Sequence, residues 1–309
     1  MSKPQGSKHV AVLMGGWSSE REVSLTSGRA CAKALAEEGY KVTPIDVGRD
    51  LAEQLAALKP DVAFNALHGP YGEDGCVQGL LEMLGIPYTH SGVLASSLAM
   101  SKPMAKAVWA SHGMPMAEGK VVHRSAFAAG PVMAHPYVIK PLNEGSSVGV
   151  HIVMDGDNYQ PQDDANWRFG ETVLVEQYIP GREIQVAVMG DRVLGAIEIR
   201  AHGRFYDYEA KYTDGKATHL MPAPIDKNAY EQVCALALEA HLTLGCRGVT
   251  RSDWRYDDTA GEPGRFYLLE INTQPGMTPL SLVPEIAAHN GISFGQLVRW
   301  MVEDASCGR

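Results

Sequence analysis

Two carboxylates and one amide in the last quarter of the chain have the types and spacing of a metal site. Glu270 and Asn272 lie near the end of the apolar run "YLLEIN", and Asp253 belongs to an earlier run, "VTRSD". Side chains at positions i and i+2 of a strand share one face, so a neighbouring strand that ends near Asp253 would complete the trio. Such an all-oxygen set suits magnesium, which keeps water or phosphate in its remaining positions. Each residue alone would more often be a solvated strand end, but the trio favours a metal.

A Gly/Ser-rich stretch offers a phosphate partner for this metal. In "VIKPLNEGSSVGV", Lys140 closes an apolar run, and a flexible loop follows with Gly145, Ser146, Ser147 and Gly149. Backbone amides and hydroxyls of such a loop can close over phosphate oxygens. The P-loop pattern, GxxxxGK followed by Ser or Thr, is absent, so the stretch predicts another kind of phosphate grip. An ordinary hairpin turn is the alternative.

A third stretch, "LVEQYIPGREI", combines an aromatic side chain with carboxylates. Glu176 and Tyr178 fall on one side of a predicted strand, and Glu183 follows a Pro-Gly turn. Free backbone groups at a strand edge, beside an aromatic face and carboxylates, can hold a purine and its ribose hydroxyls. A salt-bridged surface strand would look similar, and composition does not decide between the two.

The elements that must position these residues begin with alternating strands and helices. The alternation covers "HVAVLM", residues 21–39, "KVTPIDV", residues 50–58 and "DVAFNALHG". It predicts a parallel sheet with helical crossovers, in which function gathers at the carboxyl ends of the strands. Those ends carry Gly15, Gly16, Ser18, Glu20, His68, Gly69, Glu73 and Asp74. A dinucleotide fold is the weaker alternative, because GxGxxG is missing.

The pattern changes near residue 93. A helix is predicted over 94–113, then a hairpin with a Gly/Ser-rich tip over 132–153, and from residue 184 strands dominate. A helix over about 227–244, two strands ending in Asp253 and Glu270, and a helical segment over 282–305 complete the chain. We therefore expect three parts, at 1–93, 94–183 and 184–309.

Composition narrows the classes of partner. The 309-residue chain has a formal net charge of −9, so its surface should repel nucleic acid and anionic membranes. Its five cysteines are scattered and never spaced as CxxC, which argues against a disulfide framework or a zinc site. No run approaches membrane-spanning length, and no signal for export is readable. These features predict a cytoplasmic protein.

Eight motifs together resemble the D-alanine:D-alanine ligases of the ATP-grasp superfamily. They are "GGWSSEREVS", "ALHGPYGEDG", "YTHSGV", "IKPLNEGSSVGV", "VEQYIPGREI", "FYDYEAKY", "TRSDW" and "LLEINTQPGMTPLSLVP". The match is colinear and extends from about residue 9 to 300. The resemblance implies an α/β (α+β overall) ATP-grasp fold with an N-terminal Rossmann-like domain, and a homodimer.

The resemblance also implies ATP and two magnesium ions, for which manganese can substitute, and a set of residue roles. The implied metal ligands are Asp253, Glu270 and Asn272. The implied ATP contacts are Lys102, Lys140, Ser146, Ser147, Glu176, Tyr178, Glu183, Phe205, Lys211 and Asn272. The implied D-alanine contacts are Glu20, His68, Glu73, Arg251, Gly276, Ser281 and Leu282. The implied catalytic group comprises Glu20, Ser146, Tyr212, Arg251, Gly276 and Ser281.

The implied reaction joins two D-alanine molecules through an acyl phosphate made from ATP. Glu20 would pair with the ammonium of the first D-alanine, and Arg251 with the amide of Gly276 would form the oxyanion site. The loop "FYDYEAKYTDGK" is suited to excluding water from the acyl phosphate, with an exposed loop as the alternative. Ser101, Gln274 and Leu280 depart from the expected family pattern.

Other functions share parts of this pattern. A ligase that uses D-lactate or D-serine as acceptor would keep every ATP and metal residue. A catalytically silent ATP-binding module would hold nucleotide without consuming it, but the intact Arg251, Asp253, Glu270 and Asn272 argue against one. A nicotinamide-dependent oxidoreductase is suggested by the N-terminal alternation alone.

Overall fold

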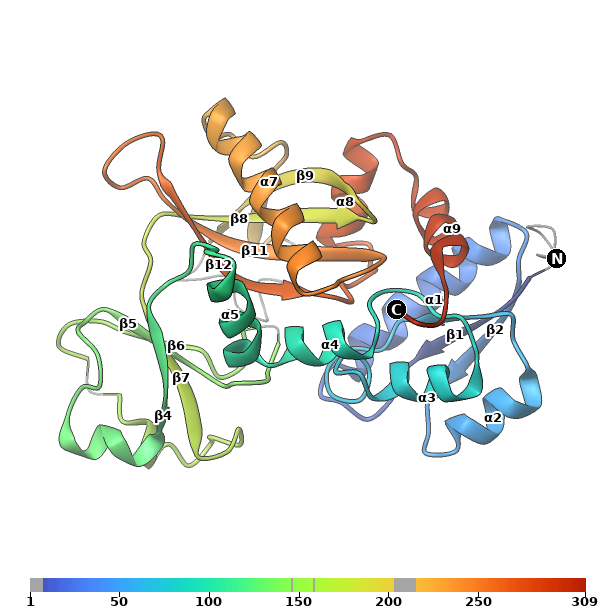
Figure 1. Ribbon diagram of the computed structural model, residues 1–309, viewed down its shortest axis with the longest axis horizontal. Coiled ribbons are helices and arrows are strands. Elements are labelled where there is room, and N and C mark those ends of the chain that lie inside the picture. Colours follow the sequence, from blue (N-terminus) through green and yellow to red (C-terminus); the bar gives the residue numbers. More distant parts are fainter. Residues whose placement is uncertain (1–7, 146, 158, 203–214) are drawn as a thin grey trace.

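The computed structural model describes residues 8–145, 147–157, 159–202 and 215–309, whose strands form three sheets (Figure 1). The first sheet is parallel with strand order β2-β1-β3, and its alternating helices confirm the N-terminal prediction. Its elements are β1 (His9–Met14), α1 (Arg21–Glu37), β2 (Lys41–Asp46), α2 (Leu51–Leu58), β3 (Val62–Asn65) and α3 (Cys76–Leu84). Residues 10–13 of the central strand β1 are fully buried, as expected for a parallel strand that is covered on both faces.

The segment predicted as one helix over 94–113 forms two helices, α4 (Val93–Met100) and α5 (Lys102–Ser111). Ser101 separates them in an extended conformation, with φ −90° and ψ 95°. Pro103 lies in the first turn of α5, where its missing N–H is not needed. The break aims Lys102, at the start of α5, toward the sheets that follow.

The second sheet is antiparallel with strand order β4-β7-β5-β6. It contains β4 (Gly119–His123), β5 (Tyr137–Lys140), β6 (His151–Val153) and β7 (Thr172–Gln177), with the 3-10 helices η2 (Arg124–Ala129) and η3 (Pro161–Asp163) between them. The pairing of β5 with β6 confirms the predicted hairpin. The edge strand β4 was not predicted, because its side chains are mostly exposed and give little alternation.

The third sheet is antiparallel with strand order β10-β9-β8-β11-β12. Its strands are β8 (Arg182–Met189), β9 (Arg192–Ala201), β10 (Ala217–Leu220), β11 (Val249–Asp257) and β12 (Arg265–Asn272). The prediction that a strand ends at Asp253 was wrong. β11 continues for four more residues because Trp254 and Tyr256 are fully buried and pack against Phe266 of β12.

Helices bind the first and third sheets into one body (Figure 1). α8 (Leu282–His289) and α9 (Phe294–Asp304) lie at this junction, whereas α7 (Lys227–Thr243) packs on the third sheet. The closing helical segment thus divides at Gly291, which has φ +73°. One hydrophobic core joins Val10 and Leu35 of the N-terminal part to Ile197 and Ile286. This shared core fixes the distance between the ends of β3 and β12.

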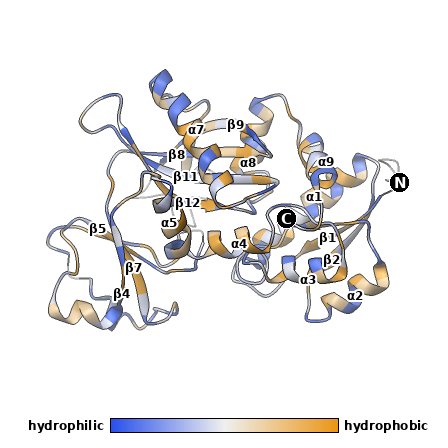
Figure 2. Ribbon diagram, in the orientation of Figure 1, coloured by the Kyte–Doolittle hydropathy of each residue, from blue (hydrophilic) through white to orange (hydrophobic). Residues whose placement is uncertain are grey.

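The helices after residue 93 pack on the third sheet, not on the second. Ala105 and Trp109 of α5 share a core with α7 and with β8, β11 and β12, and α4 is hydrophobic along much of its length (Figure 2). The second sheet has its own core around Ile139 and Val175. The domain boundaries at residues 93 and 183 stay a prediction. Within the described ranges, no helix is both long and apolar enough to cross a bilayer.

Candidate active site

Four of the predicted site residues lie on one face of the β11–β12 pair. Asp253 is the direct cross-strand partner of Glu270, and Arg251 is the partner of Asn272. The register then shifts at Leu269, which has no partner on β11, and this bulge lies beside the carboxylates. Because direct partners and i, i+2 neighbours share a face, the sheet brings the predicted trio together with an arginine.

The oxygens of this face are held by cations and amides. Arg251 donates from Nε to Asp253 Oδ1 at 2.8 Å and from Nη2 to Oδ2 at 3.0 Å. Lys102 Nζ lies 3.1 Å from Glu270 Oε2, and Asn272 Oδ1 accepts from a backbone amide at 2.8 Å. Two carboxylates and one amide oxygen fit the oxygen preference of magnesium. Among the described residues, no three His, Cys, Asp or Glu side chains form a metal-binding group.

A buried carboxylate lies between two lysines on the second sheet. Glu176 of β7 contacts Nζ of Lys140, at the end of β5, and Nζ of Lys106 on α5. Burial acts to raise the pKa of Glu176, but the two ammonium groups overcome it and hold that pKa below its ordinary value. Burial lowers the pKa of Lys106. Sequence reasoning missed Lys106, although its i, i+4 spacing from Lys102 on α5 was a readable signal.

Two neighbouring cavities gather most of the predicted site residues. The first, of about 180 Å³, lies between the second and third sheets, and the second, of about 90 Å³, adjoins the N-terminal sheet. Of the predicted residues, the first is lined by Lys102, Lys140, Ser147, Glu176, Tyr178, Glu183, Asp253 and Glu270. The second is lined by Glu20, His68, Glu73, Lys102, Arg251, Glu270, Asn272, Gly276, Ser281 and Leu282. The cavities share Lys102, Glu144 and Glu270, and sequence reasoning missed Glu144 and Gln185, which lines the second.

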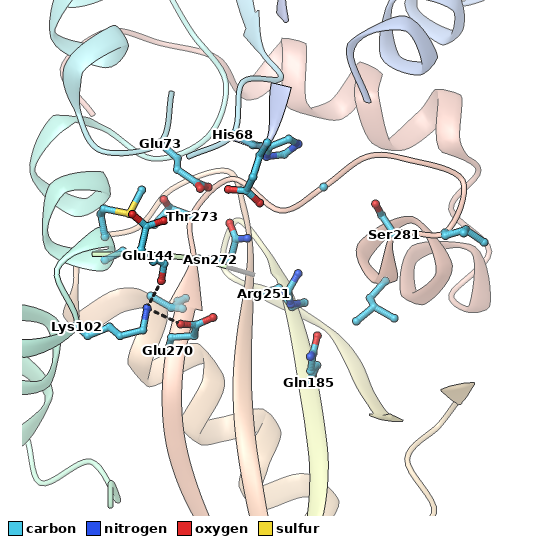
Figure 3. A pocket seen from close by; sticks show the side chains of 18 residues that line it. His68, Glu73, Lys102, Glu144, Gln185, Arg251, Glu270, Asn272, Thr273 and Ser281 are labelled. Carbon is cyan, nitrogen blue, oxygen red and sulfur yellow. Dashed lines mark hydrogen bonds and ion pairs between the residues drawn. The ribbon is translucent and has the colours of Figure 1, made fainter. Parts of the chain in front are cut away.

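Loops of the N-terminal sheet form one wall of the smaller cavity (Figure 3). Ser18 Oγ donates to the carbonyl of His68 at 2.6 Å, and the amide of Glu20 donates to Ser18 Oγ at 3.2 Å. Ser27 Oγ lies 3.4 Å from His68 Nε2. These contacts hold the loops that follow β1 and β3 side by side, so Glu20 and His68 face the same space.

Glu73 is an acid in an unfavourable place for charge. Its Oε1 accepts from the amide of Gly69 at 2.8 Å, within the loop after β3. Burial, reinforced by the negative charge of Glu20, raises the pKa of Glu73 to about 8. Burial also lowers the pKa of His68. Near neutral pH this wall therefore favours a protonated Glu73 beside a neutral imidazole.

The opposite end of the smaller cavity is built by the turn after β12. Ser281 Oγ accepts from the amide of Thr278 at 2.9 Å and lies 2.9 Å from Thr278 Oγ1. A Cβ at Gly276 would come within 2.9 Å of Ser281 Oγ, so a side chain there would displace the Ser281 hydroxyl. Arg251, Asn272 and Ser281 surround this end in Figure 3. The remaining predicted residues, Ser146, Phe205, Lys211 and Tyr212, lie outside the described residues.

Two antiparallel sheets enclose a cavity lined by lysines and carboxylates, and a parallel sheet beside them supplies a second wall. This arrangement defines an ATP-grasp fold. A family model described as "D-ala D-ala ligase C-terminus" matches residues 108–303, and one described as "D-ala D-ala ligase N-terminus" matches residues 9–54 and 49–91. The chain belongs to the D-alanine–D-alanine ligase family.

Individual relatives agree with the family models over nearly the whole chain. A D-alanine–D-alanine ligase B of Mesorhizobium japonicum is 61% identical over 306 residues, which are 98% of this chain and 99% of the relative. The D-alanine–D-alanine ligase of Parvibaculum lavamentivorans is 60% identical and covers equal shares. The crystal structure of the Bacillus anthracis ligase complexed with ATP superimposes with a TM-score of 0.81 at 32% identity, covering 96% of each chain.

Proposed function

We propose that this protein ligates two D-alanine molecules to D-alanyl-D-alanine at the expense of ATP, for peptidoglycan precursor synthesis. The observation that carries the proposal is the junction of the two cavities at Lys102, Glu144 and Glu270. A phosphate donor in the larger cavity and a carboxylate acceptor in the smaller one would meet there. The names of the curated relatives and the ATP in the Bacillus anthracis complex support the same activity.

ATP would occupy the larger cavity. Glu176, Tyr178 and Glu183 would face the purine and ribose, and Lys102 and Lys140 would reach the phosphates. Both lysines are paired with carboxylates, Lys102 with Glu270 and Lys140 with Glu176. Nucleotide binding therefore requires each lysine to exchange a carboxylate for a phosphate oxygen. Ser146, Phe205 and Lys211 belong to the proposal from the resemblance alone.

Asp253, Glu270 and Asn272 would hold two magnesium ions, or manganese in their place. When bound, these ions supply positive charge that stabilises the transferred phosphoryl group. The residues support this assignment by chemistry, because their oxygens share one face of β11 and β12 at the junction of the cavities. Arg251 pairs with Asp253 and orients its carboxylate on that face.

The reaction would begin at the first D-alanine, whose ammonium would pair with Glu20. A carboxylate oxygen of this D-alanine attacks the γ-phosphorus, the bond from that phosphorus to the bridging oxygen of ADP breaks, and an acyl phosphate forms. The neutral amine of the second D-alanine, held near Ser281 and Leu282, then attacks the acyl carbon. The tetrahedral intermediate directs its oxyanion toward Arg251 and the amide of Gly276. Loss of phosphate and of the amine proton yields the dipeptide.

The assembly and location are further parts of the proposal. Large apolar side chains are exposed on the neighbouring helices α3 and α4, namely Met83, Leu84, Val93 and Leu94. We propose that this surface contributes to a homodimer, because single monomers seldom expose such groups together. A monomeric sedimentation coefficient at micromolar concentration would contradict the dimer. The cytoplasmic location stays a prediction.

The test of the activity is D-alanine-dependent release of ADP. Purified protein is given ATP and magnesium with and without D-alanine, and the product is identified by mass spectrometry. D-Alanyl-D-alanine and a stoichiometric amount of ADP are expected. ATP binding without D-alanine-dependent release of ADP would indicate a catalytically silent nucleotide-binding module. ADP release only with D-lactate or D-serine as second substrate would show that one of these, and not D-alanine, is the acceptor.

A further inference from the structure

Two buried carboxamides connect the N-terminal sheet to the candidate active site. Asn65 is the last residue of β3, and Gln274 follows β12. Both β3 and β12 are edge strands of their sheets. Asn65 Nδ2 donates to Gln274 Oε1 at 2.7 Å, although the two residues are 209 positions apart. The exposed fractions are 0% for Asn65 and 1% for Gln274. A contact this distant in sequence and this well buried fixes how the two sheets meet.

Each carboxamide also binds the backbone of the loop after β3, Gln274 from the opposite wall and Asn65 from the same wall. Gln274 Nε2 donates to the carbonyl of Leu67, and Asn65 Nδ2 donates to the carbonyl of Gly72 at 2.9 Å. Asn65 Oδ1 accepts from the amide of Leu67 at 3.2 Å. The amide atoms thus hold both ends of the loop 67–72, which contains His68 and is directly followed by Glu73. Buried polar groups are costly to leave unpaired, so the loop conformation and the two side chains depend on each other.

Gln274 also reaches the proposed metal face, through its backbone. The amide of Gln274 donates to Asn272 Oδ1 at 2.8 Å. Asn272 is the cross-strand partner of Arg251, and the turn goes on to Gly276. Gln274 therefore contacts both walls. Its side chain contacts the wall that carries His68 and Glu73, and its main chain contacts the wall that carries the proposed oxyanion site.

We propose that the Asn65–Gln274 amide pair is a positioning device that sets the distance between the two walls of the smaller cavity, and thereby the geometry of the first D-alanine. The inference deepens the proposed function and rests on it. Gln274 touches neither a substrate nor a reacting atom in this proposal, so it acts through the loop 67–72. A displacement of a reacting group by about 1 Å can cost a hundredfold in rate, which is why such a spacer matters.

The test compares saturation by D-alanine with saturation by ATP. Gln274→Met keeps the length and burial of the side chain but removes both side-chain hydrogen bonds. We expect the KM for D-alanine to rise about tenfold and kcat to fall, while the KM for ATP changes by less than about twofold. A residue that merely stabilises the fold would lower the active fraction and leave both KM values unchanged, and that result would overturn the proposal.

Gln78 provides the matched control. Its Nε2 donates to the same carbonyl of Gly72 at 3.0 Å and it is equally buried, but this hydrogen bond stays within the N-terminal part and does not reach the turn after β12. Gln78→Met should therefore leave the KM for D-alanine within about twofold of the wild-type value. An equal rise in both variants would mean that the loop alone matters and would reject the link between the sheets.

Two further measurements keep the test decisive. If Gln274→Met does not fold, Gln274→Asn retains the amide but shortens it by one methylene, and the same split between the two KM values is expected. Hydrogen exchange of residues 66–73 tests the pair without any assay of activity, because Gln274→Met should accelerate exchange there about tenfold or more and Gln78→Met should leave the turn 273–277 unchanged. Absence of D-alanine-dependent ADP release in the wild type would overturn the proposed function, whereas unchanged exchange in Gln274→Met would overturn the amide pair.

Discussion

Lys102 Nζ lies 3.1 Å from Glu270 Oε2, at the point where the two cavities of the site join. The side chain of Lys102 is only 11% exposed, and the same Nζ also donates to the carbonyl of Glu144. The lysine thus pairs with a carboxylate that the proposed function gives to magnesium. The ion pair orients Glu270 at the junction of the two cavities, where the proposed function places the transferred phosphoryl group.

Glu270→Gln should therefore damage turnover far more than folding. The amide keeps the shape of the side chain but loses the negative charge that would hold metal against the transferred phosphoryl group, so we expect kcat to fall by about a hundredfold or more. ADP release under saturating D-alanine and ATP measures the effect. Glu239→Gln, at an exposed position of α7, is the control. Near-normal turnover of Glu270→Gln would remove this residue from the metal site.

Lys106→Met should weaken ATP binding, although no role in ATP binding was predicted for this residue. Without Lys106, the buried carboxylate of Glu176 is paired only with Lys140. If Lys140 then turned to a phosphate, Glu176 would be left buried without a cation. Loss of one partner of a buried charged group costs about 1–3 kcal/mol, so the Kd for ATP should rise about five- to a hundredfold. Isothermal titration calorimetry gives the Kd directly.

The exposed lysine of β4 provides a comparison for this charge change. Lys120→Met removes one positive charge from the strand paired with β7 but leaves Glu176 untouched. Its Kd for ATP should stay within about twofold of the wild-type value. Equal weakening by both substitutions would point to the overall charge of the second sheet and would contradict a specific role for Lys106.

The face of β11 and β12 could be predicted because it depends on local rules. The i, i+2 spacing of Glu270 and Asn272 and the apolar runs around them specify two strands with oxygens on one side. The N-terminal alternation specified a parallel sheet for the same kind of reason. The resemblance to the ligase family then supplied the roles of residues that no local pattern distinguishes, such as Ser281.

Contacts between residues far apart in sequence could not be predicted in this way. The pairing of Lys106 with Glu176 and of Asn65 with Gln274 depends on how three sheets dock, which no periodicity within one element encodes. Gln274 was noticed only as a departure from the family pattern, and its partner 209 positions away gives that departure a physical reason. Polar residues that are buried where two sheets pack together are thus the part of a site that is hardest to predict from sequence.

Glu20→Ala should chiefly impair use of the first D-alanine. Glu20 is buried in the wall of the smaller cavity, and its backbone is held through Ser18 to the carbonyl of His68. Removing its carboxylate would leave the substrate ammonium without its counter-charge, so the KM for D-alanine should rise about tenfold or more while the KM for ATP changes little. Glu22→Ala, at an exposed position on α1, is the matched control. Unchanged saturation by D-alanine would exclude the ammonium pairing.

The raised pKa of Glu73 predicts how the stability of the ligand-free protein depends on pH. The native protein holds this proton up to a pKa of about 8, whereas the unfolded chain releases it near 4.5. Between these two pKa values the native state binds more protons than the unfolded state. The titration of Glu73 therefore lowers the free energy of unfolding as the pH rises, by at most about 1.4 kcal/mol per pH unit. Glu73→Gln removes the titration. The free energy of unfolding of Glu73→Gln, relative to wild type, should therefore increase from pH 5 to pH 8 in urea titrations without nucleotide or metal.

A second glutamate separates this effect from a general change in charge. Glu53→Gln, at an exposed position of α2, alters the net charge equally, but Glu53 does not line the smaller cavity. Its effect on unfolding should vary little across the same pH range, because exposed charges interact weakly through water. If Glu73→Gln gave a difference as flat as that of Glu53→Gln, Glu73 would be ionised in the native protein at neutral pH. That result would contradict a protonated Glu73 in the cavity wall.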